Sequence, residues 1–458
     1  MTVQNPMPAV DHDAAPAGGD PPFPSRAQAY YSLIVLTVVV MFSTLDRSVM
    51  ALLIEPIKHD FGLTDTEMAF LLGAAFSITY GIVGIPIARI ADSWNRRNLI
   101  AISIGVWGFC TMAGGIAQNY WGLILARLGI GVGESGYGPA SWSIVADSFP
   151  REKVAFGVGI LAIGAMLGIG LASFCGGAIL ALVKHVPPIA VPLIGIIRPW
   201  QWVFILVGLP GFLWAFLVMT THEPARRGVG SAQPVPMPVG EVVRFVCDDW
   251  RTYLAVIGGA GMKILLAAGQ ATWGATFFHR RFHWELSNIG MITGAMTLIV
   301  SPLATIVGGK ISERWTREGR PDANLRIVTY GLIASVPLWT LSPLLPNPWL
   351  VLACNAVAIF VGTIGMGPGF AAIQVVSPPR IRAQIGSLSQ FSTNVIAFAL
   401  SPLIVALFTD YVFHDPAKLG YSIALNAASM GAIAILITWQ GLKPYARACA
   451  RAERGWID

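Results

Sequence analysis

The run AYYSLIVLTVVVMFSTLDRSVMALLI, residues 29–54, is long and apolar enough to cross a membrane as one helix, yet it carries Asp46 and Arg47 side by side. A second apolar run, residues 120–146, carries Arg127 and Glu134. A charge near the middle of a membrane helix costs about 2.5–3.5 kcal/mol on insertion scales. Because ions kept at such a cost usually mark a functional pathway, these four residues indicate where the working chemistry lies.

The composition defines the broad class of protein. The chain has 458 residues, of which 55% are hydrophobic and 12% are charged, whereas a soluble domain has about 25% charged residues. We therefore expect an all-α membrane protein with twelve transmembrane helices. The approximate spans are 29–54, 67–90, 98–117, 120–146, 154–184, 200–221, 251–278, 287–309, 325–344, 348–376, 384–410 and 419–440.

Lys and Arg are unevenly distributed among the segments that join these spans. With the N-terminus inside the cell, about two-thirds of the 30 Lys and Arg residues lie in inner segments and about a fifth in outer ones. Because inner loops are enriched in Lys and Arg, we expect a multi-pass protein of the cell membrane with both termini in the cytoplasm. Positive charge confined to short loops does not indicate nucleic-acid binding.

Five regions are expected along the chain. Residues 1–27 are predicted to be a disordered cytoplasmic tail and contain no apolar stretch typical of a signal peptide. Residues 28–221 and 251–440 are predicted to be two six-helix bundles. Residues 222–250 are expected to form a cytoplasmic linker with a short amphipathic helix, and residues 441–458 a second tail. The five cysteines are dispersed, so we expect no structural disulfide.

The second half of the chain repeats the first. The matched landmarks are Phe61 with Phe282, Gly73 with Gly294, Asp92 with Glu313, and Gly138-Pro139 with Gly367-Pro368. The offset is constant on either side of one longer loop, which favours a true repeat over chance. Two bundles in pseudo-twofold parallel repeat are the arrangement in which a transporter holds its substrate between its halves.

The repeat does not extend to the ions. The same register places Ala267 and Ala268 opposite Asp46 and Arg47, and it places Ala356 and Thr363 opposite Arg127 and Glu134. The second half thus keeps the scaffold and omits the charges. We infer that the first half carries the working chemistry.

Several motifs carry a family resemblance. The segments GIPIARIADSWNRR (84–97) and RLGIGVG (127–133) resemble signatures of the major facilitator superfamily. The stretches LDRSVMALLIEPIKHDFGLT, ADSWNRRN and GVGESGYGPASWSIVADSFP resemble the Spinster family within it. The loop after the second span departs from the superfamily pattern at Ala88, Ser93 and Asn95, of which the Asn is Spinster-like. The resemblance implies alternating access, lysolipid or sphingoid-phosphate substrates and, for some members, proton coupling.

The four ions suggest a coupling site. Asp46, Arg47 and Arg127 lie at similar depths, and Arg127 and Glu134 lie on one helix face about 10 Å apart. Burial raises the pKa of a carboxyl group and a nearby Arg lowers it. Our hypothesis is that Asp46 and Glu134 exchange protons, while Arg47 and Arg127 tune their pKa or bind an anionic headgroup. The alternative is a static ion network that fixes two helices together.

Further charges are candidates for gates and substrate contacts. Asp92, Arg96 and Arg97 are predicted to close the inner side, as are Glu313 and Arg314 in the second half. For Arg96 and Arg97, the need for positive charge in inner loops is a sufficient alternative. Lys263, near the middle of the seventh span, is predicted to attract an anionic headgroup, or else to pair with a carbonyl group.

The expected function is proton-coupled secondary active transport of an amphipathic, lipid-like molecule or a related organic anion. A sugar-acid or drug carrier of the same superfamily is the chief alternative; a passive lipid conduit and a non-transporting receptor are alternatives of other classes. We find no enzyme motif, metal-ligand spacing or phosphate-binding loop, and we expect no cofactor. The expected partners are the bilayer, a small anionic substrate and protons, with the chain acting as a monomer.

Overall fold

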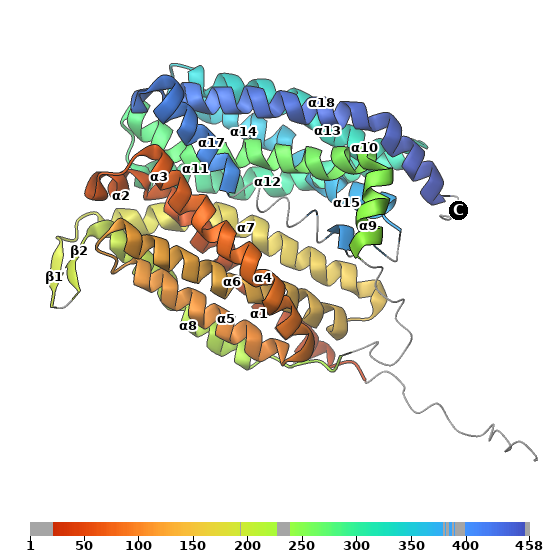
Figure 1. The fold of residues 1–458 in the computed structure, drawn as a ribbon, viewed down its shortest axis with the longest axis horizontal. Helices are drawn as coiled ribbons and strands as arrows, with labels where there is room; N and C mark the ends of the chain where they lie inside the picture. Colours follow the sequence, from red (N-terminus) through yellow and green to blue (C-terminus); the bar gives the residue numbers. More distant parts are fainter. Residues whose placement is uncertain are drawn as a thin grey trace, which may run out of the picture.

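The computed structural model describes residues 22–192, 194–226, 239–378, 381, 384–386, 389 and 399–453. The helices form two bundles that lie against one another (Figure 1). The predicted all-α fold is confirmed, with one short antiparallel hairpin, β1 (Ile189–Val191) and β2 (Gly195–Ile197), in addition. This hairpin was not predicted.

The first bundle contains six membrane-crossing segments. They are formed by α1 (Arg26–Val49), α3 (Asp65–Ala69) with α4 (Ala75–Ser93), α5 (Arg96–Gly114), α6 (Tyr120–Ser148), α7 (Arg151–Val183) and α8 (Pro199–Met219). The short helix α2 (Ile54–Phe61) lies between α1 and α3.

The second bundle follows the linker helix α9 (Val239–Asp248). It is formed by α10 (Trp250–Tyr253) with α11 (Gly259–Phe282), α12 (Leu286–Arg317), α13 (Ala323–Leu341), α14 (Pro348–Ile364) with α15 (Met366–Val376), α17 (Ser401–Leu407) and α18 (Leu419–Glu453). Short 3-10 or π turns extend or join these helices: η1 (Met50–Leu52), η2 (Phe70–Ala74), η3 (Leu254–Gly258), η4 (Ser342–Leu344), η6 (Phe408–Phe413) and η7 (Pro416–Lys418). Residues 387, 388 and 390–398 of the predicted span 384–410 lie outside the described residues.

Helix boundaries follow from local capping. Ser25 starts α1 in a capping box with Gln28, and Thr64 starts α3 in a capping box with Glu67. Each box satisfies backbone N–H groups that the first helical turn leaves free. Gly62, with φ of 66°, ends α2 in the left-handed conformation that glycine adopts without strain.

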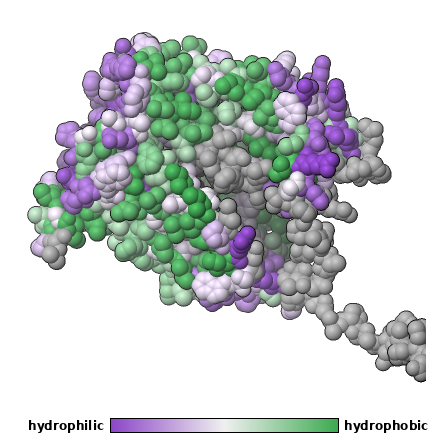
Figure 2. All heavy atoms as spheres, in the orientation of Figure 1, coloured by the Kyte–Doolittle hydropathy of each residue, from purple (hydrophilic) through white to green (hydrophobic). Residues whose placement is uncertain are grey.

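The surface is that of a membrane protein. Within the described residues, nine helices are long and apolar enough to cross a membrane by length and composition. Helices α5 and α6 pack among them, and α6 contains Arg127, Glu134 and Asp147. Hydrophobic residues form the middle of the visible face and hydrophilic residues gather toward its two ends (Figure 2).

The two ends of the molecule differ. Helix α1 begins and α18 ends at one end, which we call the termini end; α2 and the β-hairpin lie at the other, the hairpin end (Figure 1). One buried core joins both bundles at the hairpin end, and it includes Leu53 and Ile57 of the first bundle with Trp273 and Phe278 of the second. The other buried cores each belong to a single bundle. The bundles are therefore sealed together at the hairpin end.

Candidate functional site

One ion pair of the site joins α1 to α6. Arg47 Nε lies 2.5 Å from Glu134 Oε2, and the Glu134 side chain is fully buried. Arg47 also donates to Ser43 Oγ at 3.1 Å and to the Tyr137 hydroxyl at 3.4 Å. Its guanidinium carbon lies 4.9 Å from the centroid of the Phe76 ring, a distance suited to a cation–π contact. These contacts hold the cation in one orientation.

Asp46 and Arg127 form the other part of the site. The two residues are 2% and 3% exposed, respectively. Asp46 lies near Arg127 and faces Thr111 and Trp107 of α5. Arg127 itself contacts Met50 and lies 5.9 Å from the ring centroid of Phe204. Because neighbouring residues on a helix point about 100° apart, Asp46 and Arg47 turn toward different opposite charges on α6.

Glycines allow α6 to approach its neighbours closely. A Cβ atom added at Gly133 would lie 2.6 Å from the backbone nitrogen of Trp107. One added at Gly131 would lie 2.8 Å from the backbone oxygen of Phe76. Neither contact leaves room for a side chain, so glycine is required at both positions. The close packing brings the ions of α6 against the helices that surround them.

Lys263 lies on α11 in the second bundle. A Cβ atom added at Gly365, which separates α14 from α15, would lie 3.5 Å from Lys263 Nζ. No acidic side chain in the described part of the chain pairs with Lys263. Its predicted role in attracting an anionic headgroup stays a prediction.

Arg96 and Arg97 lie at the start of α5. The buried Arg96 side chain forms an ion pair with Asp147 of α6, and its Nε lies 2.8 Å from Glu223 Oε1. The backbone N–H of Arg97 donates to Glu223 Oε2 at 2.8 Å. These partners belong to α6 and to the segment after α8. In this conformation Arg96 fastens that segment to the first bundle, and its role in gating stays a prediction.

The other predicted gate residues lie on exposed surface or outside the description. On α12, Arg314 Nε lies 3.0 Å from Glu318 Oε1, and Glu313 pairs with Arg317. Both pairs are separated by one helical turn, and their side chains are exposed. Asp92 lies in α4, but its side chain is not among those that the structure describes.

A cluster of ions at the hairpin end was not predicted. Arg280 of α11 donates to both Asp65 oxygens at 2.8 and 2.7 Å, and its Nε lies 2.7 Å from Glu55 Oε1. Lys58 of α2 forms a second ion pair with Asp65. We call Glu55, Lys58, Asp65 and Arg280 the hairpin-end ion cluster. It links the two bundles through side chains more than 200 positions apart in the chain. Local sequence patterns give no signal for pairs so far apart.

Two more polar contacts join the bundles at this end. Asp410 accepts from the backbone N–H of Thr66 at 2.8 Å and from its hydroxyl at 2.6 Å. Lys184 Nζ lies 2.9 Å from Glu285 Oε2.

A two-bundle helical protein with an apolar belt and a buried ion network between helices has the architecture of a multi-pass membrane transporter. The sequence model of the Major Facilitator Superfamily matches residues 36–402. The chain belongs to this superfamily, as its motifs had indicated.

Its relatives include transporters with several named roles. It is 28% identical over 451 residues to an "MFS-type efflux pump" of Mycolicibacterium smegmatis, covering 96% of this chain and 98% of the relative. It is 22% identical to "Protein spinster" of Drosophila melanogaster, covering 92% and 70%. It is 20% identical to a "Probable L-galactonate transporter" of Escherichia coli, covering 83% of each chain.

A solved structure has the same fold. It is the crystal structure of a bacterial homolog of the human lysosomal transporter Spinster, in an inward-facing and unoccupied conformation. The TM-score is 0.75 at 22% sequence identity, and the match covers 94% of this chain and 99% of the other. The resemblance to Spinster transporters seen in the motifs is therefore confirmed in both sequence and fold.

Proposed function

We propose that this transporter is a proton-coupled secondary carrier that works by alternating access and moves an amphipathic, lipid-like anion such as a lysolipid or a sphingoid phosphate. The observation that supports this most is the buried group of Asp46, Arg47, Arg127 and Glu134. Two acids and two arginines balance in charge, so the addition of one proton changes the balance at a site that is shielded from water.

The proposed coupling acts through Arg47. While Glu134 is ionised, its carboxylate neutralises Arg47 at 2.5 Å. When Glu134 binds a proton, this neutralising charge is lost, and an uncompensated charge in a buried site is costly. A carboxylate or phosphate headgroup can restore the balance, because guanidinium groups bind both with paired hydrogen bonds. Proton binding and anion binding are thus linked through one side chain.

The substrate class follows from the facing bundle. Lys263 supplies a further positive charge, and its side chain is only partly buried by its neighbours. The positions that match the ions of the first half are Ala267, Ala268, Ala356 and Thr363, which offer little polarity. Positive charge beside an apolar wall suits a molecule with an anionic head and a hydrocarbon tail.

We further propose that both termini lie in the cytoplasm, as the distribution of Lys and Arg favours. The hairpin end is then the outer side, and the shared core with the hairpin-end ion cluster corresponds to a conformation closed to the outside. The proposed inner-gate residues act in the opposite conformation; they are Asp92, Arg96, Arg97, Glu313 and Arg314.

Uptake into proteoliposomes tests the coupling. The purified chain is reconstituted, and uptake of labelled lysolipid or sphingoid phosphate is followed with and without an imposed pH gradient. Glu134→Gln removes the proton-binding group with almost no change in size. We expect stimulation by the pH gradient to be lost, because the variant has no group at this position that can bind and release a proton.

Glu241→Gln is the matched control, because it makes the same chemical change at an exposed position of the linker helix α9. We expect it to retain full stimulation. If Glu134→Gln transports with undiminished dependence on the pH gradient, Glu134 has no part in coupling.

A sugar-acid carrier is the second candidate. It is favoured by the galactonate transporter among the relatives and by the positive charge of Lys263. The same assay separates the two, since competition by a sugar acid without competition by lysolipid selects this candidate.

A further inference from the structure

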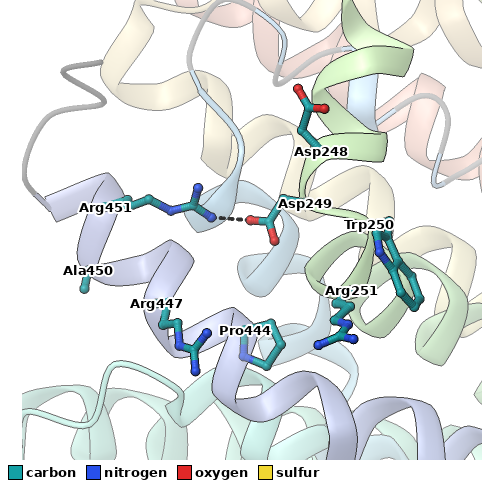
Figure 3. A pocket seen from close by; sticks show the side chains of 8 residues that line it. All are labelled: Asp248, Asp249, Trp250, Arg251, Pro444, Arg447, Ala450 and Arg451. Atoms are coloured by element: carbon teal, nitrogen blue, oxygen red, sulfur yellow. Dashed lines mark hydrogen bonds and ion pairs between the residues drawn. The ribbon is translucent and has the colours of Figure 1, made fainter.

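A cavity of about 550 Å³ lies at the termini end of the second bundle, between the end of α9, the start of α10 and the last turns of α18. Small-ligand sites occupy about 300–1,000 Å³, so the cavity can hold a headgroup. Figure 3 shows the side chains that line it: Asp248, Asp249, Trp250, Arg251, Pro444, Arg447, Ala450 and Arg451. The cavity is far from the ions of the first bundle, and the proposed transport cycle does not use it.

One wall of the cavity is fixed by an ion pair. Arg451 of α18 pairs with Asp249, the residue before α10. Asp249 also accepts a hydrogen bond from the Thr252 hydroxyl at 2.8 Å. The pair, drawn as a dashed line in Figure 3, ties α18 to the start of the second bundle. Beneath it, the buried Tyr445 and Cys449 belong to the core at this end of the bundle.

Two further arginines supply positive charge. Arg251 and Arg447 lie on either side of Pro444 (Figure 3). In the described part of the chain neither has an ion pair, and Arg251 lies 5.4 Å from the ring centroid of Trp250. Because Arg451 neutralises Asp249, two arginines and the single carboxylate of Asp248 determine the charge of the cavity. The net charge is positive.

The surroundings place the cavity at the depth of lipid headgroups. Trp250 is 54% exposed and Leu254, one turn further into the membrane-crossing segment, is 44% exposed. Exposed tryptophan at the end of a membrane helix is typical of the membrane–water interface. Hydrophilic residues gather toward the termini end of the visible face (Figure 2). An apolar contact for acyl chains thus adjoins a basic cavity.

We propose that this cavity binds the phosphate of an anionic phospholipid headgroup from the adjoining leaflet. Arg251 and Arg447 hold the phosphate oxygens, and Trp250 packs against the glycerol and the first part of the acyl chains. Basic pockets at the ends of membrane helices recognise anionic lipids in this way. Free phosphate shares the headgroup chemistry, but it gains nothing from the apolar surface of Trp250 and Leu254.

Native mass spectrometry of the purified full chain in detergent, titrated with phosphatidylglycerol or phosphatidylcholine, tests this proposal. Wild-type protein is expected to retain phosphatidylglycerol in preference to phosphatidylcholine. In the double variant Arg251→Gln/Arg447→Gln, the affinity for phosphatidylglycerol is expected to fall roughly tenfold to thirtyfold, at about 1 kcal/mol for each arginine. Lys310→Gln, an equal loss of charge at an exposed site on α12, is the control and is expected to bind as wild type.

Two further measurements distinguish loss of lipid binding from misfolding, and binding of the lipid from binding of free phosphate. Asp248→Asn removes the remaining carboxylate from the lining and is expected to increase phosphatidylglycerol retention, a gain that misfolding does not produce. Inorganic phosphate is expected to compete only weakly. Equal retention by wild type and the double variant, or inorganic phosphate binding as tightly as the lipid, overturns the proposal.

Discussion

Two adjacent residues of α1 serve two different partners on α6. Arg47 meets Glu134 directly, whereas Asp46 is turned toward Arg127 and α5. Because both partners are buried, a change in the charge of one ion changes the electrostatic energy of the other three. The four side chains therefore behave as one unit, and single substitutions within it are expected to be non-additive.

Arg280→Gln tests the hairpin-end ion cluster. The variant loses the paired hydrogen bonds to Asp65 and the contact with Glu55, so the state closed at the hairpin end should lose on the order of 1–3 kcal/mol. Distances between spin labels placed at the hairpin ends of the two bundles should show a smaller closed fraction in the variant.

The neighbouring Arg281→Gln is the control for that measurement. Arg281 donates to the backbone oxygens of Pro343 and Leu344, which belong to its own bundle. Its loss should leave the closed fraction unchanged. An equal shift in both variants would mean that general loss of positive charge, rather than the cluster, changes the conformation.

At the scale of helices, α7 and α12 form a close crossing between the bundles. A Cβ atom added at Gly290 of α12 would lie 2.9 Å from the backbone oxygen of Ser173, and one added at Gly177 of α7 would lie 2.6 Å from that of Ser287. The two helices thus meet through backbone at these positions. The crossing lies beside Ile289, which belongs to the core that joins the bundles at the hairpin end.

Gly290→Val is predicted to separate α7 from α12. Overpacking of this kind costs about 1–3 kcal/mol, so the purified variant should unfold at a lower temperature and transport more slowly. Gly309→Val is the matched control on the same helix, because a Cβ atom there meets nothing within 4 Å. If both variants unfold at the same temperature, the crossing is not close packed.

The sequence predicted the helical fold and its repeat because the apolar spans and glycine landmarks are periodic along the chain. It also predicted the four buried ions, since a charge in an apolar run is conspicuous. The partners of Arg280 could not be predicted, because charges at helix ends are ordinary and their pairing depends on how the bundles pack. The β-hairpin was missed because its strands are only three residues long.

At the scale of the whole molecule, the bundles are joined at the hairpin end and their cores are separate toward the termini end. The shared core closes the hairpin end. The sidedness of the chain in the membrane therefore decides which compartment faces the closed end.

Cysteine labelling tests the proposed sidedness. Cys247 on α9 is exposed at the termini end. With Cys110, Cys175, Cys354 and Cys449 replaced by serine, an impermeant maleimide should label Cys247 in inverted vesicles and leave it unlabelled in intact cells. A variant that instead carries Ala190→Cys on the hairpin should give the reverse pattern. Labelling of Cys247 in intact cells would place the termini outside.

The second cation beside Asp65 has a consequence for turnover. Lys58 and Asp65 belong to the same bundle, whereas Arg280 belongs to the other. When the bundles part, Asp65 keeps Lys58 as a counter-ion, so the fully buried acid of the cluster is not left unpaired at the moment of separation. The activation barrier for opening is thereby lowered. The hairpin-end ion cluster can therefore stabilise the closed conformation without making each transport cycle slow.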